Sequence, residues 1–69
     1  MISLNKVQQF QIACLEGYKI FKKKSGKKAL NDFQTYGVFE FIETGYEVLH
    51  TQSIDYVVAE IDDFIKHRK

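Results

Sequence analysis

Apolar residues recur along the chain at the three- and four-residue spacing of amphipathic α-helices. This pattern predicts four helices, which cover about residues 4–24, 27–36, 38–50 and 54–66. The stretch 36–53 is the expected centre of the fold, because its apolar residues occupy more than one side of a helix. No proline, no Asn-Gly pair and no sustained alternation of apolar and polar residues favours a strand. The expected structure is all-α, a single compact four-helix domain over residues 1–69.

Residues at the ends of the predicted helices support these bounds. Ser25 and Ser53 are expected N-caps, because a serine hydroxyl accepts a hydrogen bond from a free N–H of the first turn. Gly37 fits the position after the second helix, where a left-handed conformation is needed. Gly17 lies within the apolar stripe of the first helix, where glycine costs about 1 kcal/mol relative to alanine. We therefore expect another helix to cross closely at Gly17.

The chain is too short to enclose all of its apolar side chains. A domain of 69 residues buries only about 60% of the surface that its unfolded chain exposes, and this one carries six phenylalanines and four tyrosines. We therefore expect an apolar surface that another protein or a second copy covers, as a homodimer would. The residues predicted to contact a protein partner are Ile12, Phe39, Phe41, Tyr46 and His50.

Charge is divided unevenly along the chain, although its net value is only +1. Residues 1–28 sum to +6, residues 29–65 to −8 and residues 66–69 to +3. The simplest interpretation is that basic and acidic helices complement one another within the molecule. The same division would also steer a charged partner or favour head-to-tail pairing of two copies.

A lysine cluster between residues 19 and 28 supports an alternative function, the binding of nucleic acid. Several lysines on one corner of the protein would neutralise phosphates and release counterions. The acidic remainder of the surface opposes a broad nucleic-acid footprint. The residues predicted to contact nucleic acid are Lys22, Lys23, Lys24, Lys27 and Lys28.

The reactive side chains have structural interpretations. Cys14 lies in the apolar stripe of the first helix and is expected to be a buried small hydrophobe. His50 is expected to cap carbonyl groups at a helix end, and Asp62 and Asp63 to form a solvated face. No spacing typical of a metal site or a phosphate-binding loop occurs. We therefore expect no catalytic residue, no metal and no cofactor, and no enzyme activity.

The expected location is the cytoplasm. A single cysteine cannot form an internal disulfide, which fits a reducing setting. No apolar run approaches the roughly 18 residues that span a membrane, and polar residues interrupt the N-terminal region where a signal peptide would need an apolar block.

Several segments carry a resemblance to a known family. A first helix containing phenylalanine is followed by SGKKAL, YGVFEFIE, YEVLHTQS and DYVVAEIDDFI. Over nearly the whole chain this pattern resembles a family of small helical bacterial proteins classed as a domain of unknown function. Its most specific part is the box Tyr46-x-x-Leu49-His50-Thr51. Some members of that family are encoded beside proteins similar to ADP-ribosyltransferase toxins, so the resemblance implies an antitoxin or immunity role and no catalytic residue.

The sequence thus predicts a non-enzymatic module that binds another protein. An antitoxin-like or immunity-like partner of a toxin is the most specific form of this hypothesis. Nucleic-acid binding through the lysine cluster is the alternative.

Overall fold

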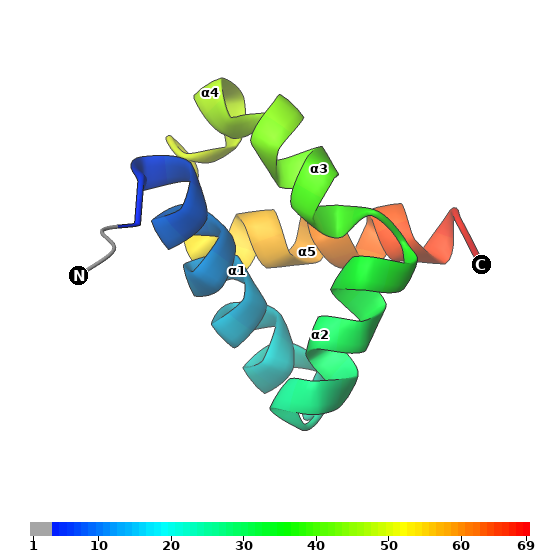
Figure 1. Ribbon diagram of the computed structural model, residues 1–69. Helices are drawn as coiled ribbons and strands as arrows, with labels where there is room; N and C mark the ends of the chain where they lie inside the picture. Colours follow the sequence, from blue (N-terminus) through cyan, green and yellow to red (C-terminus); the bar gives the residue numbers. More distant parts are fainter. Residues whose placement is uncertain (1–3) are drawn as a thin grey trace.

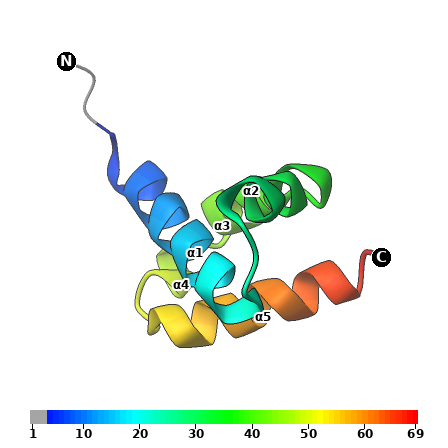
Figure 2. The ribbon, with the colours of Figure 1, turned by 90° about the horizontal axis from the view of Figure 1, so that it is seen from below.

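The computed structural model describes residues 4–69 and confirms the all-α prediction, since this part of the chain contains helices and no strand. The helices are α1 (Lys6–Lys22), α2 (Gly26–Thr35), α3 (Val38–Thr44), α4 (Tyr46–Leu49) and α5 (Ile54–Lys66). Helices α1, α2 and α3 outline a triangle, and α5 crosses behind them (Figure 1). Viewed from below, α5 runs along one side of the other helices (Figure 2). The molecule therefore has two layers, of which α5 is one.

Helix α1 is two residues shorter at each end than the predicted segment 4–24. Asn5 is the N-cap: its side chain accepts a hydrogen bond from the Gln8 backbone N–H at 2.8 Å, and the Gln8 side chain accepts one from the Asn5 N–H at 3.0 Å. This reciprocal capping box fixes the start of the helix at Lys6. At the other end, Lys23 adopts the left-handed conformation with a φ of 53°, so the helix ends at Lys22.

The predicted caps of α2 and α5 are confirmed. The hydroxyl of Ser25 accepts a hydrogen bond from the Lys28 N–H, and that of Ser53 accepts one from the Tyr56 N–H, each at 3.2 Å. Gly37 has a φ of 69°, the left-handed region that the end of α2 requires. The bounds of α5 agree with the predicted segment 54–66.

The predicted helix over residues 38–50 is wrong as a single element. It breaks at Gly45, whose N–H still bonds to the Phe41 carbonyl at 3.0 Å while the chain turns into the four-residue helix α4. The apolar spacing continues through the break, so periodicity did not reveal it. Glycine lowers helix propensity and allows the turn. The domain therefore has five helices over residues 4–69, of which four are seven residues or longer.

The core is shared between α5 and residues 36–53, which contribute four and three of its buried apolar residues. Four of the eleven buried apolar residues belong to α5, more than to any other helix. These eleven residues are Cys14, Tyr18, Ala29, Phe33, Val38, Ile42, Leu49, Val57, Val58, Ile61 and Ile65. The uniform amphipathic pattern of α5 reflects this burial.

The close crossing predicted at Gly17 is confirmed. A Cβ atom added to Gly17 would lie 2.8 Å from the Ile54 Cγ2 atom and 2.9 Å from the Val58 Cγ2 atom, both in α5. Real Cβ atoms do not approach other atoms so closely, so α5 would have to shift. The glycine therefore permits α1 and α5 to pack at this distance.

We expect Gly17→Ala to lower the free energy of unfolding by about 1 kcal/mol. Overpacking of the crossing costs about 1–3 kcal/mol, which outweighs the gain of about 1 kcal/mol in helix propensity. Urea denaturation measures the change. Gly26→Ala is the matched control, because its added Cβ would meet the Lys19 side chain at an ordinary 3.8 Å. A Gly17→Ala variant that gained as much stability as Gly26→Ala would contradict the crossing argument.

Candidate protein-binding face

One broad side of the layer formed by α1, α2 and α3 has no other helix over it (Figures 1 and 2). The opposite side is covered by α5. There Gly17 of α1 packs against α5, and the ring of Phe41 in α3 stacks on Phe64 with centroids 4.2 Å apart. Side chains on the other flank of α1 and α3 therefore border the uncovered side, because a helix presents its residues at 100° intervals.

Apolar side chains from three helices occupy this uncovered side. By helical spacing, Ile12 and Leu15 lie on the side of α1 away from Gly17, and Phe39 lies on the side of α3 away from Phe41. Leu30 is an exposed residue of α2. Ile12 is 47% exposed and Leu30 is also exposed, whereas Leu15 and Phe39 are partly buried against the core. The Gln11 side chain donates a hydrogen bond to the Phe39 carbonyl at 2.9 Å and joins α1 to α3 here. We call Ile12, Leu15, Leu30 and Phe39 the open face.

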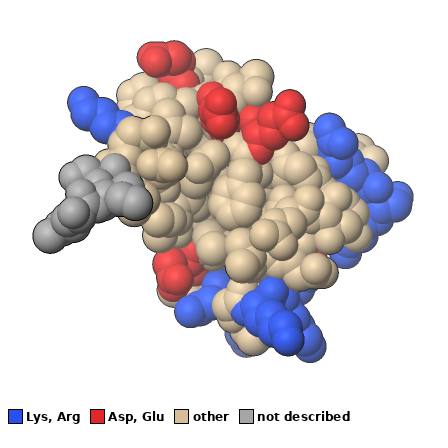
Figure 3. All heavy atoms as spheres, viewed as in Figure 1, with Lys and Arg blue, Asp and Glu red and all other residues tan. Residues whose placement is uncertain are grey.

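Charged groups border the open face at two opposite ends. Figure 3 shows acidic groups along the upper edge, near α3 and α4, basic groups at the lower edge, near the α1–α2 connection, and uncharged surface between them; further basic groups line the right-hand edge, and a basic and an acidic group lie at the left. The acids of α3 and α4 are Glu40, Glu43 and Glu47, here called the acidic edge. The exposed lysines around the α1–α2 connection are Lys23, Lys27 and Lys28, here called the basic edge. Among residues 4–69, no member of either edge forms an ion pair.

Two of the five lysines predicted to contact nucleic acid are held by acids of other segments. The Lys22 Nζ atom lies 3.0 Å from the Asp62 Oδ1 atom in α5, and Lys24 pairs with Asp32 in α2. These contacts agree with the predicted complementarity between basic and acidic helices. Of the five lysines, only the three of the basic edge then remain to bind phosphates. Nucleic-acid binding stays a prediction, and it rests on fewer charges.

Asp62 is buried, which corrects the prediction that it belongs to a solvated face. Asp62 is only 8% exposed. Its carboxylate oxygens lie 3.0 Å from the Lys22 Nζ atom and 3.2 Å from the Lys66 Nζ atom. Burial favours the neutral acid, but hydrogen bonds from both lysines outweigh burial and hold the pKa of Asp62 below its ordinary value. Asp63 is exposed, as predicted.

A second polar cluster joins α1 to α2 and was not predicted. The hydroxyl of Tyr18, a buried residue, donates a hydrogen bond to the Asp32 Oδ2 atom at 2.9 Å, and Lys24 binds the same oxygen. Burial, together with the carboxylate, raises the pKa of Tyr18 to about 12. Burial favours the protonated form of Asp32, but the bonds from Lys24 and Tyr18 lower its pKa. A buried tyrosine needs a partner for its hydroxyl, and this requirement is the sequence signal that could have indicated the cluster.

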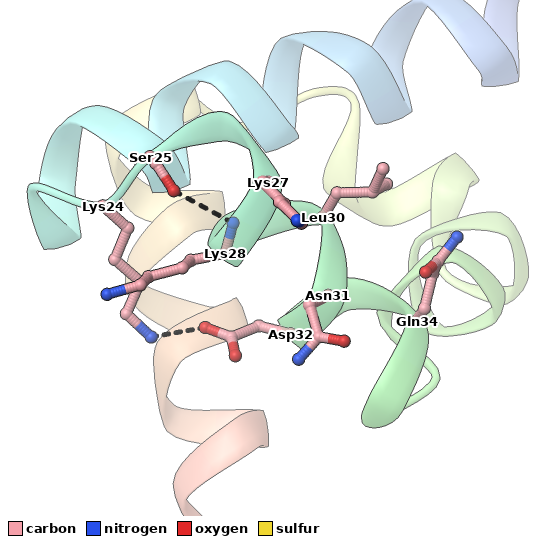
Figure 4. Close-up of a pocket in the computed structure, with 8 residues that line it drawn as sticks. All are labelled: Lys24, Ser25, Lys27, Lys28, Leu30, Asn31, Asp32 and Gln34. Atoms are coloured by element: carbon pink, nitrogen blue, oxygen red, sulfur yellow. Dashed lines mark hydrogen bonds and ion pairs between the residues drawn. The ribbon is translucent and has the colours of Figure 1, made fainter.

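A hollow of about 590 Å³ lies beside the start of α2 (Figure 4). Lys24 and Asp32 pair on one side of the helix, and Leu30 and Gln34 point away from that pair. The Ser25 hydroxyl is occupied as the cap of α2. The remaining lining residues are Lys27, Lys28 and Asn31. The groups of a catalytic site converge on one point, and the side chains that line this hollow do not.

The five residues predicted to contact a protein partner do not form one surface. Ile12 and Phe39 lie on the open face, whereas Phe41 is turned toward α5. Tyr46 and His50 lie together at α4, with parallel rings whose centroids are 4.5 Å apart. The His50 Nδ1 atom donates a hydrogen bond to the Tyr46 carbonyl at 2.6 Å, which confirms the predicted capping role.

Two large apolar residues outside the open face are exposed. Phe21 at the end of α1 is 56% exposed, and Val48 in α4 is 68% exposed. Val48 follows the break at Gly45, where the chain turns from α3 into α4. Cys14, in contrast, is fully buried as predicted, and burial raises its pKa to about 11, so the thiol is protonated at neutral pH.

Residues 4–69 contain neither a metal-binding cluster nor a helix that could span a membrane. No group of three histidine, cysteine, aspartate or glutamate residues in this range is arranged to hold a metal ion. No helix in it combines the length and the apolar character needed to cross a bilayer.

These features define the class of the protein: a small all-α domain whose one layer of three helices is covered on a single side. Within that class, the chain belongs to a family described as protein of unknown function, DUF3791, whose model matches residues 9–68. No functionally curated protein matches the chain, and no solved structure does.

Proposed function

We propose that this protein is a non-catalytic module that acts by binding another protein through the open face. The observation that carries this proposal is the uncovered apolar side of the α1–α2–α3 layer. Helical layers bury their apolar sides against other elements, and this side has no such element within residues 4–69. Ile12 and Leu30 are the exposed anchors, and the charged edges would orient the partner.

The most specific form of the proposal is an antitoxin-like or immunity-like role. Inhibition by contact needs a docking surface and no reactive group, which suits a domain whose thiol is buried and protonated. The resemblance to helical proteins encoded beside toxins of the ADP-ribosyltransferase type supports the same role. The partner would then be the toxin, bound at the open face.

Co-expression with the product of the adjacent gene tests this proposal. We expect the two proteins to co-purify and the pair to relieve any growth inhibition that the neighbour causes alone. Ile12→Asp should weaken the complex at least tenfold, because it places a charge at the centre of an apolar interface. A circular dichroism melt of the free variant shows whether it is folded. We expect it to fold, because Ile12 is half-exposed and an aspartate there can reach water.

Ile20→Asp is the matched control. Ile20 has the same side chain on the same helix and is 72% exposed. It lies about 12 Å further along α1 and is rotated about 80° from Ile12 and about 140° from Leu15. It should leave the complex intact. Equal loss with both variants, or no complex with the wild type, would argue against the open face as the binding site. Oligonucleotide binding that falls steeply with salt would instead favour the nucleic-acid alternative.

A further inference from the structure

We propose that a second copy of this chain covers the open face when no other protein is bound. The inference rests on the open face of the proposed function and adds the occupant of that face in the free protein. The pair would be a symmetric dimer in which the same surface of each copy meets itself. Its consequence is regulatory, since self-pairing and partner binding would exclude one another.

The arrangement of charge around the face carries this inference. The acidic edge (Glu40, Glu43 and Glu47) and the basic edge (Lys23, Lys27 and Lys28) lie at opposite ends of it (Figure 3). A two-fold axis that runs across the face, between these ends, turns the second copy end for end. The acidic edge of each copy then lies on the basic edge of the other, and the contact occurs twice.

Neither edge is neutralised inside the molecule. Lys22 and Lys24 pair with buried or half-buried acids, whereas no ion pair within residues 4–69 includes any of the six edge residues. A partner of one charge sign would satisfy one edge and oppose the other. A second copy satisfies both edges at once, so the surface is complementary to itself.

The apolar centre of the face suits the middle of such a pair. Ile12 and Leu30 are exposed, and Leu15 and Phe39 form the partly buried floor beneath them. A specific interface of ordinary size removes about 800 Å² from each partner. The accessible surface of this chain is 4981 Å², so the dimer would cover about one sixth of it.

Light scattering over a concentration series at low salt tests the pairing. The wild type should rise from the monomer mass of 8.1 kDa toward twice that value. Glu40→Lys with Glu43→Lys makes both edges basic, and Lys27→Glu with Lys28→Glu makes both acidic. Each double variant should self-associate at least tenfold more weakly than the wild type. An equimolar mixture of the two should recover the dimer, because every edge contact is again between opposite charges.

The controls separate this inference from the proposed function. Ile12→Asp should lower self-association at least tenfold, and Ile20→Asp should not change it. A wild type that stays monomeric at every concentration overturns the inference, as do two charge-swapped variants that fail to pair when mixed. A monomeric wild type that still binds the neighbouring protein through Ile12 would leave the proposed function standing. A dimer without any protein partner would remove the proposed function and leave the dimer.

Discussion

Replacing Phe33 with alanine is expected to lower the free energy of unfolding by about 3–5 kcal/mol. Phe33 is fully buried, and its ring packs against those of Tyr18 and Phe39 with centroids 5.3 Å away in each case. It thus links α1, α2 and α3 at the centre of their layer. A domain of this length has a total stability of about 3–10 kcal/mol, so much of the Phe33→Ala protein should be unfolded at 37 °C. Thermal and urea denaturation followed by circular dichroism measure the loss.

Phe21→Ala is the control for this prediction, since it removes the same atoms from a side chain that is 56% exposed. A surface substitution of this kind changes stability by about 0.5 kcal/mol. The two variants therefore differ only in the burial of the phenylalanine. Similar losses from both would show that Phe33 is not the centre of the layer.

Local signals predicted a large part of this fold. A capping serine depends on its own sequence neighbourhood, and so the starts of α2 and α5 followed from Ser25 and Ser53. The amphipathic period of α5 is complete because one side of the helix packs against α1 and, through Phe64, against Phe41 of α3. The break at Gly45 escaped prediction because the apolar period runs through it and a lone glycine is tolerated inside helices.

The candidate site was harder to predict because it depends on how the helices are arranged. Ile12 was among the residues predicted to contact a partner, and it is 47% exposed. Phe39 and Phe41 could not be told apart by sequence spacing, since the position of α5 decides which of them is covered. Burial of Asp62 likewise follows from the approach of Lys22 on another helix. Such contacts join residues far apart in sequence, which periodicity does not register.

Removal of the Asp32 carboxylate should produce the second large effect. Asp32→Ala leaves the buried Tyr18 hydroxyl without its acceptor, and an unsatisfied buried polar group costs about 1–3 kcal/mol. Asp32→Asn should cost less, because an amide oxygen still accepts the tyrosine bond while the charge facing Lys24 is lost. Asp63→Asn is the control at an exposed carboxylate of the same type. Urea denaturation at pH 7 ranks the three variants.

The same carboxylate should make stability depend on acid pH. The pKa of Asp32 is lower in the folded protein than its ordinary value of 3.8, because the bonds from Lys24 and Tyr18 outweigh the effect of burial. Its contribution is therefore complete above about pH 4 and is lost as the pH falls through the lower folded pKa. The free energy of unfolding of the wild type should decline below about pH 4. The free energy of unfolding of Asp32→Asn should decline less steeply, because this variant lacks the Asp32 carboxylate. The decline that remains comes from Asp62, the other carboxylate with a lowered pKa. The control Asp63→Asn should show the acid dependence of the wild type. If Asp32→Asn shows it too, Lys24 and Tyr18 do not stabilise the charged form of Asp32.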